Sequence, residues 1–107
     1  MLDHYRVLAT DICLLLHDKP RISLTQCARM FGVGRHTASR AIRRVLGQTF
    51  TDLQSQFLRD LARHQLADPN KSIKEIAYSI GYKSDAAFSR RVKRLEGCTP
   101  IALRRRA

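Results

Sequence analysis

The sequence predicts an all-α protein in which a linker helix joins two similar helical units. Two observations predict this fold. The chain repeats itself at an offset of about half its length, and each copy carries the start and stop signals of two helices. With 107 residues, the chain is long enough for one domain or two small lobes.

The internal repeat appears when the chain is aligned with itself at an offset of 49 residues in the first part of each copy and 50 in the second. The one-residue insertion falls just after the turn of the second copy. Apolar positions also agree, notably Leu24/Ile73, Val33/Tyr82, Ala38/Phe88, Ile42/Val92 and Val45/Leu95. Eight positions are identical: Ser23/Ser72, Ala28/Ala77, Gly32/Gly81, Ser39/Ser89, Arg40/Arg90, Arg44/Arg94, Gly47/Gly97 and Thr49/Thr99.

Each copy opens with a capping box, at residues 23–26 and 72–75. In this motif the serine oxygen accepts from a first-turn amide, while a Gln or Glu three residues later accepts from the serine amide. A short helix should follow each box and end at Gly32 or Gly81, because glycine tolerates a left-handed backbone. A second helix, rich in Arg and Ser, should then run to residue 47 or 97. This arrangement is a helix-turn-helix, and it is predicted twice.

The flanking segments are also predicted to be helical. A linker helix is expected over residues 51–67, capped by Thr49, with apolar residues at helical spacing. Residues 3–17 carry a further apolar face that should cover the open side of the first unit. The expected parts are thus an N-terminal helix with the first unit (1–50), the linker (51–67), and the second unit with a C-terminal helix (68–107). The apolar positions used here are Leu53, Phe57, Leu61 and Leu66 in the linker, and Tyr5, Leu8, Ile12 and Leu15 or Leu16 before it.

The net charge of +11 indicates a polyanionic partner. The charge is not uniform: residues 21–47 hold six arginines and no acid, and residues 71–94 hold seven basic and two acidic side chains. Residues 48–70, between these blocks, are slightly acidic. We therefore expect each unit to present a basic face to the same polyanion.

The stretch from residue 84 to 100, SDAAFSRRVKRLEGCTP, resembles the signature of AraC/XylS-type DNA-binding domains, in which S-x-x-x-F-x-R-x-F-K precedes G-x-[ST]-P. Residues 68–82 and 32–40 also resemble that family, so the similarity covers roughly residues 20–104. Gly34 stands where the family usually has serine, and Leu58-Arg59 reverses the usual Arg-Leu pair. The resemblance implies a homeodomain-like fold, sequence-specific binding of double-stranded DNA and regulation of transcription in the bacterial cytoplasm.

Helical spacing selects the residues that would read DNA. Side chains on the first two turns of a recognition helix reach base edges, and flanking cations neutralise phosphates. The predicted base-reading residues are His36, Ser39 and Arg40 in the first unit, and Asp85, Ala86, Ser89 and Arg90 in the second. The predicted phosphate contacts are Arg35, Arg43, Arg44, Lys83, Arg91, Lys93 and Arg94.

Structural roles remain open for several of these residues. Arg40 and Arg90 could form intramolecular ion pairs, for example Arg90 with Glu75, and Ser39 and Ser89 could be plain surface serines. Asp85 and Ala86 are poor candidates for strong base contacts. Alanine can contact only a thymine methyl, and aspartate is repelled by nearby phosphates unless it accepts from a cytosine amino group. The second unit is therefore expected to contribute more to affinity than to specificity.

The linker sets the expected reach on DNA. A helix of about 17 residues is about 25 Å long, and with the width of each unit it matches one DNA turn of about 34 Å. One monomer is therefore expected to reach two successive major grooves.

No enzyme, cofactor or metal site is expected. The four histidines are scattered, no sheltered carboxylate pair exists and no glycine-rich phosphate loop appears. Cys13 and His17 are four residues apart, but two ligands make a weak metal site. The odd number of cysteines favours reduced thiols, and the longest apolar run, residues 12–16, is too short to span a membrane.

Other functions stay open. The chain could be a fragment of a longer regulator, because the family often joins this domain to an effector-binding domain. A different class would be a helical protein-interaction module that presents its basic face to an acidic partner such as RNA polymerase. Leu2 and Leu14 widen the apolar face of the first helix, so a dimer interface or a sensor-domain docking site could lie there.

Overall fold

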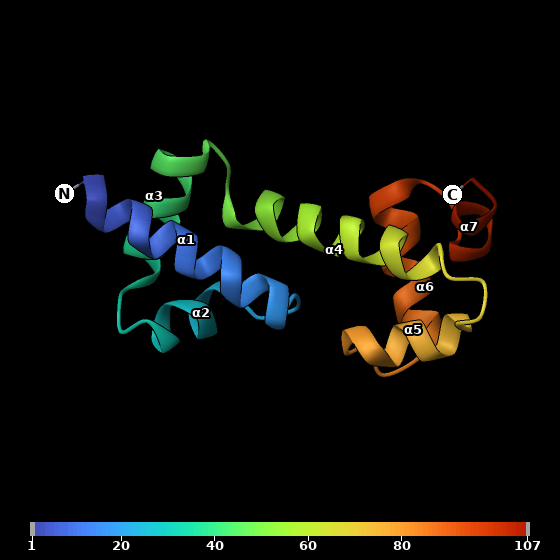
Figure 1. Cartoon of the computed structure of the whole chain (residues 1–107). Helices are drawn as coiled ribbons and strands as arrows, with labels where there is room; N and C mark the ends of the chain where they lie inside the picture. The colour runs from blue at the N-terminus through green and yellow to red at the C-terminus, as the bar shows by residue number, and fades with distance from the viewer. Residues whose placement is uncertain (1, 107) are drawn as a thin grey trace. The chain divides into compact units, whose positions relative to one another are not determined.

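The computed structural model describes residues 2–106, and every regular element in that range is an α-helix (Figure 1). The all-α prediction is confirmed. The helices are α1 (Leu2–Asp18), α2 (Leu24–Met30), α3 (Arg35–Leu46), α4 (Phe50–Leu66), α5 (Ile73–Ile80), α6 (Asp85–Glu96) and α7 (Pro100–Arg106).

The chain divides into two compact units, and the division falls inside α4, between Phe57 and Leu58. Each unit has its own apolar core. In unit 1, α1, α2, α3 and the first half of α4 contribute fully buried side chains such as Ile12 and Ile42. In unit 2, the second half of α4 joins α5, α6 and α7 around Phe88. The predicted linker helix is therefore not a bare spacer, because its two halves are core elements of different units.

The structural repeat extends further than the sequence identities. At an offset of 50 residues, the buried face of α1 corresponds to the second half of α4, and the first half of α4 corresponds to α7. Each helix-turn-helix is therefore packed between one preceding and one following helix, and α4 takes both roles. The equivalent buried pairs are Leu8/Leu58, Ile12/Ala62, Leu16/Leu66, Phe50/Pro100 and Leu53/Leu103.

An equivalent polar tether ties down the loop before each helix-turn-helix. In unit 1, the Gln54 amide Nε2 donates to the carbonyls of Pro20 at 3.0 Å and Ile22 at 2.6 Å. Fifty residues later, the Arg104 guanidinium donates to the carbonyls of Leu66 at 2.9 Å, Asp68 at 3.3 Å and Lys71 at 2.5 Å. Both side chains satisfy loop carbonyls that have lost helical partners.

The predicted helix boundaries are confirmed at their caps. Both capping boxes form, with Ser23 Oγ accepting from the Gln26 amide at 3.1 Å and Ser72 Oγ from the Glu75 amide at 3.0 Å. Thr49 caps α4 by accepting from the Asp52 amide at 3.1 Å. Gly32 and Gly81 adopt the predicted left-handed backbone, with φ of 66° and 109°, and the stop glycines Gly47 and Gly97 adopt it too, with φ of 68° and 75°. Helix α2 itself ends at Met30, two residues before the expected Gly32.

Candidate nucleic-acid interface

The second helix of unit 1, α3, turns its polar residues toward solvent because its small apolar residues fill the core. Ala38, Ala41 and Ile42 are fully buried. His36 and Arg40 are exposed on the opposite face, and Ser39 is half-buried beside them. Since residues three and four apart share a helix face, these three side chains form one surface patch.

The corresponding helix of unit 2, α6, is oriented in the same way. Phe88 and Val92 point into the core. The predicted base-reading residues lie outside: Asp85, Ala86 and Arg90 are exposed, and Ser89 is half-buried. The two helices begin differently, because the Ser84 Oγ accepts from the Ala87 amide at 3.1 Å whereas Gly34 provides no side-chain cap to α3.

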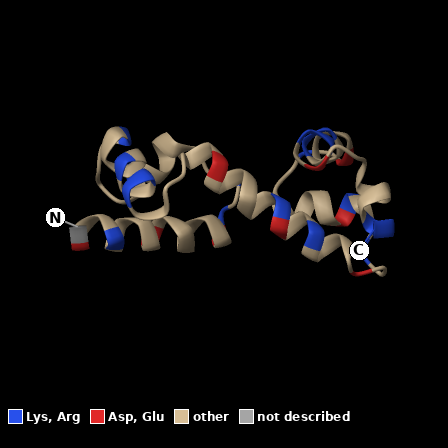
Figure 2. Cartoon of the chain, turned by 90° about the horizontal axis from the view of Figure 1, so that it is seen from above, with Lys and Arg blue, Asp and Glu red and all other residues tan. Residues whose placement is uncertain are grey.

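Basic residues occur in both units, and Figure 2 shows their distribution along the helices. Six of the seven predicted phosphate contacts are exposed, namely Arg35, Arg43, Arg44, Lys83, Lys93 and Arg94, and Arg91 is half-buried. Arg43 and Lys93 follow Arg40 and Arg90 by three residues. Each of them therefore lies on the same helix face as the predicted base readers, one turn further along. The prediction had placed both residues among the phosphate contacts only.

Arg40 and Arg90, two of the predicted base readers, are not held in internal ion pairs within residues 2–106. Among residues 2–106, the salt bridges join Arg59 and Arg63 to Glu96, and none involves Arg40 or Arg90. The alternative pairing of Arg90 with Glu75 is not among these salt bridges, and one Glu75 carboxylate oxygen accepts from the Ser72 amide at 3.3 Å.

A hollow of about 270 Å³ lies beside the start of α3, lined by Leu24, Arg35, His36 and Ser39. Leu24 comes from α2, so the helix-turn-helix itself brings the four side chains together. Sequence reasoning missed Leu24 because its position inside the capping box was read only as a helix-start signal. The hollow offers one apolar wall and several donors near the residues proposed to read bases.

At the other end of α6, Glu96 forms a network that fixes the helix to α4. The Arg63 guanidinium binds Glu96 at two points, Nε to Oε1 at 3.0 Å and Nη2 to Oε2 at 2.6 Å. The hydrogen bond and charge of Glu96 raise the pKa of Arg63. The Arg59 side chain is 43% exposed, and its Nε is buried, lies 3.7 Å from Glu96 Oε1 and makes no hydrogen bond.

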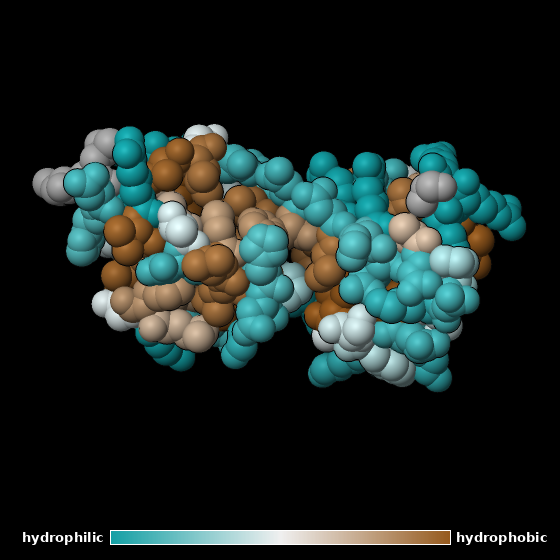
Figure 3. Space-filling model, viewed as in Figure 1, coloured by the Kyte–Doolittle hydropathy of each residue, from teal (hydrophilic) through white to brown (hydrophobic). Residues whose placement is uncertain are grey.

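Cys13 and Cys27 are packed within unit 1. Burial raises the pKa of the Cys13 and Cys27 thiols, which disfavours thiolates. His17 packs edge-on against Phe57, with ring centroids 4.6 Å apart, and residues 2–106 contain no cluster of three potential metal ligands. Leu14 is 63% exposed. Figure 3 shows hydrophobic side chains on the viewed face of unit 1. The Leu2 side chain lies outside the described part of the chain.

No helix within residues 2–106 has the length and apolar character needed to cross a membrane.

Two units, each pairing a short helix with a basic, solvent-facing second helix across a four-residue turn, define a double helix-turn-helix protein. The comparisons agree with this class. Residues 27–106 match the family described as the helix-turn-helix domain. The chain therefore belongs to this family, in its AraC-type form.

Individual relatives support the same assignment. The chain is 40% identical over 83 residues to the HTH-type transcriptional regulator GlxA of Rhizobium meliloti, covering 78% of this chain and 26% of GlxA. It resembles the C-terminal domain of AraT, a response regulator from Geobacillus stearothermophilus, with a TM-score of 0.78, 26% identity, and 96% and 84% of the two chains covered. It also shares the fold of an AraC-type DNA-binding domain protein from Chromobacterium violaceum, with a TM-score of 0.74, 24% identity, and 94% and 91% covered. The chain spans between 13% and 31% of the length of the curated relatives it matches.

Proposed function

We propose that the chain binds double-stranded DNA sequence-specifically and regulates transcription. One observation carries the proposal: in both helix-turn-helix units, the basic second helix turns an exposed row of polar and charged side chains to solvent and buries only apolar ones. The family assignment and the similarity to a named transcriptional regulator support it. The net charge of +11 would attract the chain to the negatively charged DNA backbone.

In the proposed mechanism, α3 and α6 each enter a major groove. His36, Ser39 and Arg40 read base edges in one groove, and Arg40 has the planar donor pair that can bind a guanine at O6 and N7. The exposed row on α6 would occupy the second groove, where Ser89 and Arg90 are its main polar readers. The flanking cations would hold phosphates and fix the register of both helices.

The proposal includes binding as a monomer to two successive grooves. Its support is that α4 is one uninterrupted helix of 17 residues, about 25 Å long, with each end built into a different unit. A contact with RNA polymerase, and a place in the cytoplasm, would follow from a role in transcription and are part of the same proposal.

Selection of bound sites from a random pool of duplexes tests the proposal. We expect enrichment of one defined sequence, and the wild-type protein should bind it at least about 1,000-fold more tightly than random duplex at physiological salt. Arg40→Ala should reduce this ratio. Arg105→Ala, which removes the same charge from α7, should leave the ratio nearly unchanged. Weak binding that ignores sequence would instead favour a protein-interaction module with a basic face.

A further inference from the structure

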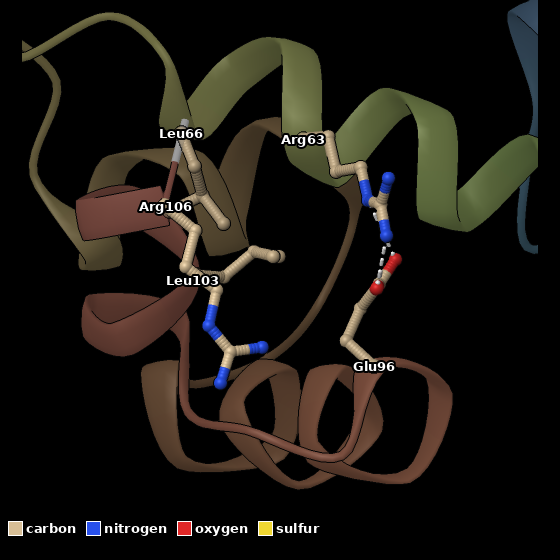
Figure 4. A pocket seen from close by; sticks show the side chains of 5 residues that line it. All are labelled: Arg63, Leu66, Glu96, Leu103 and Arg106. Atoms are coloured by element: carbon tan, nitrogen blue, oxygen red, sulfur yellow. Dashed lines mark hydrogen bonds and ion pairs between the residues drawn. The ribbon is translucent and has the colours of Figure 1, made fainter.

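Unit 2 contains a cavity that the proposed DNA contacts do not use. It has a volume of about 300 Å³ and is lined by Arg63 and Leu66 of α4, Glu96 of α6, and Leu103 and Arg106 of α7. Figure 4 shows Arg63 and Glu96 bonded to each other on one side, with Arg106 and the two leucines around the remaining space. None of these residues belongs to the proposed base-reading or phosphate-binding sets.

The walls of the cavity are of two kinds. Leu66 and Leu103 are core residues: Leu66, 0% exposed, lies beneath the surface of the cavity, and Leu103, 6% exposed, offers its apolar contact. The polar side is cationic overall, because two arginines stand against one glutamate. An occupant therefore needs an apolar body and one negative charge.

The arginines in and beside the cavity differ in how many internal hydrogen bonds and ion pairs they already form. Arg63 is held by both carboxylate oxygens of Glu96. The guanidinium of the neighbouring Arg104 donates hydrogen bonds to three backbone carbonyls. Arg106, by contrast, is exposed and forms no salt bridge within residues 2–106. It is the guanidinium available to a ligand, and its planar donor pair suits a carboxylate.

We propose that this cavity binds a small amphipathic carboxylate, with the carboxylate on Arg106 and the apolar body against Leu103. A volume of about 300 Å³ lies at the small end of the range for ligand sites, which suits a single aromatic ring bearing a carboxylate. Three of the five lining side chains are charged, and polar groups that converge beside apolar surface give small-molecule sites their specificity. Glu96 contributes by neutralising Arg63, which leaves Arg106 as the anchor.

Titration of the protein with benzoate, followed by two-dimensional NMR without DNA, tests the site. We expect saturable amide shifts at Leu66, Glu96 and Leu103, with a dissociation constant in the millimolar range that is usual for a fragment of this size. Benzamide, which keeps the ring and lacks the charge, and inorganic phosphate, which keeps charge and lacks the ring, should each bind about tenfold more weakly or worse.

A matched pair of variants distinguishes benzoate binding in the cavity from non-specific attraction of anions to the basic surface. Arg106→Met should weaken benzoate binding about tenfold or more, whereas Arg105→Met, which removes the same charge outside the cavity, should change it little. Equal losses in both variants, phosphate or benzamide binding as tightly as benzoate, or no shifts at the cavity would overturn the proposal. Because no DNA is present, these outcomes are independent of the proposed transcriptional function.

Discussion

Arg40 is the single residue on which specificity should depend most. It is exposed on α3, shares a face with His36 and Ser39, and forms no salt bridge within residues 2–106. We expect Arg40→Ala to cost about 1–3 kcal/mol on the preferred site and to relax the preference at one or two base pairs. Site selection with the variant, compared with wild type, measures both effects. An unchanged selected sequence would remove Arg40 from the base-reading set.

Arg43 and Lys93 test the separation between base and phosphate contacts. With six to ten phosphate contacts, the logarithm of the binding constant should fall against the logarithm of salt concentration with a slope of roughly −5 to −9. If either residue binds a phosphate, its replacement by Ala should weaken all duplexes alike and make the slope shallower by about one.

The structure adds an alternative outcome for the same two residues, because they continue the helix face of Arg40 and Arg90. A sequence-dependent loss, rather than a uniform one, would place them among the base readers. Binding measured at several salt concentrations on specific and random duplexes distinguishes the two results.

At the scale of elements, the capping boxes should make measurable contributions to stability. Ser23→Ala removes the side chain that accepts from the Gln26 amide at the start of α2 and should cost about 0.5–2 kcal/mol of unfolding free energy. Thr25→Ala is the control on the same helix, where alanine is a better helix former and stability should hold or rise slightly. Urea denaturation measures both, and equal effects would argue against the cap.

Helix α4 has to be continuous if it is to join two reading units. Gln56 is exposed in the middle of α4, whereas Arg59 is partly buried beside Glu96, so position 56 disturbs fewer contacts. Gln56→Pro should break the helix at a cost of about 3 kcal/mol or more and lower DNA affinity far more than Gln56→Ala. The DNase footprint should shrink toward one half-site. A full-length footprint with unchanged affinity would show that the units bind without a rigid connection.

At the scale of the whole molecule, the two recognition helices are similar in fold and different in surface. The first unit presents His36 and Arg40 where the second presents Ala86 and Arg90. The preferred DNA site should therefore be asymmetric and better defined under the first unit. Selected sites that are perfect palindromes would contradict recognition by one chain.

Stoichiometry follows from the same duplication. If one chain supplies both reading helices, one monomer should saturate one duplex and protect roughly 20 base pairs, or about two DNA turns. Analytical ultracentrifugation of the complex at the lowest saturating concentration measures this directly. Two chains per duplex would mean that a dimer fills the paired grooves.

The sequence by itself determined the local structure and the duplication. Capping boxes, stop glycines and helical spacing depend on residues within one or two turns of each other, so Ser23, Gly47 and their counterparts could be assigned without tertiary information. The exposure of the predicted base readers followed for the same reason, because burying Ala38 and Ile42 forces His36 and Arg40 to the opposite face of α3.

Only the tertiary structure decided which distant side chains meet. The Arg63–Glu96 pair joins residues 33 apart, and the Arg104 tether joins its carbonyl partners across 33 to 38 residues. The same packing makes Arg59 partly buried and closes the cavity beside Arg106. Folding brings these groups together by burying the apolar faces of α4, α6 and α7, and no periodicity within one helix encodes where a charged side chain from another helix will lie.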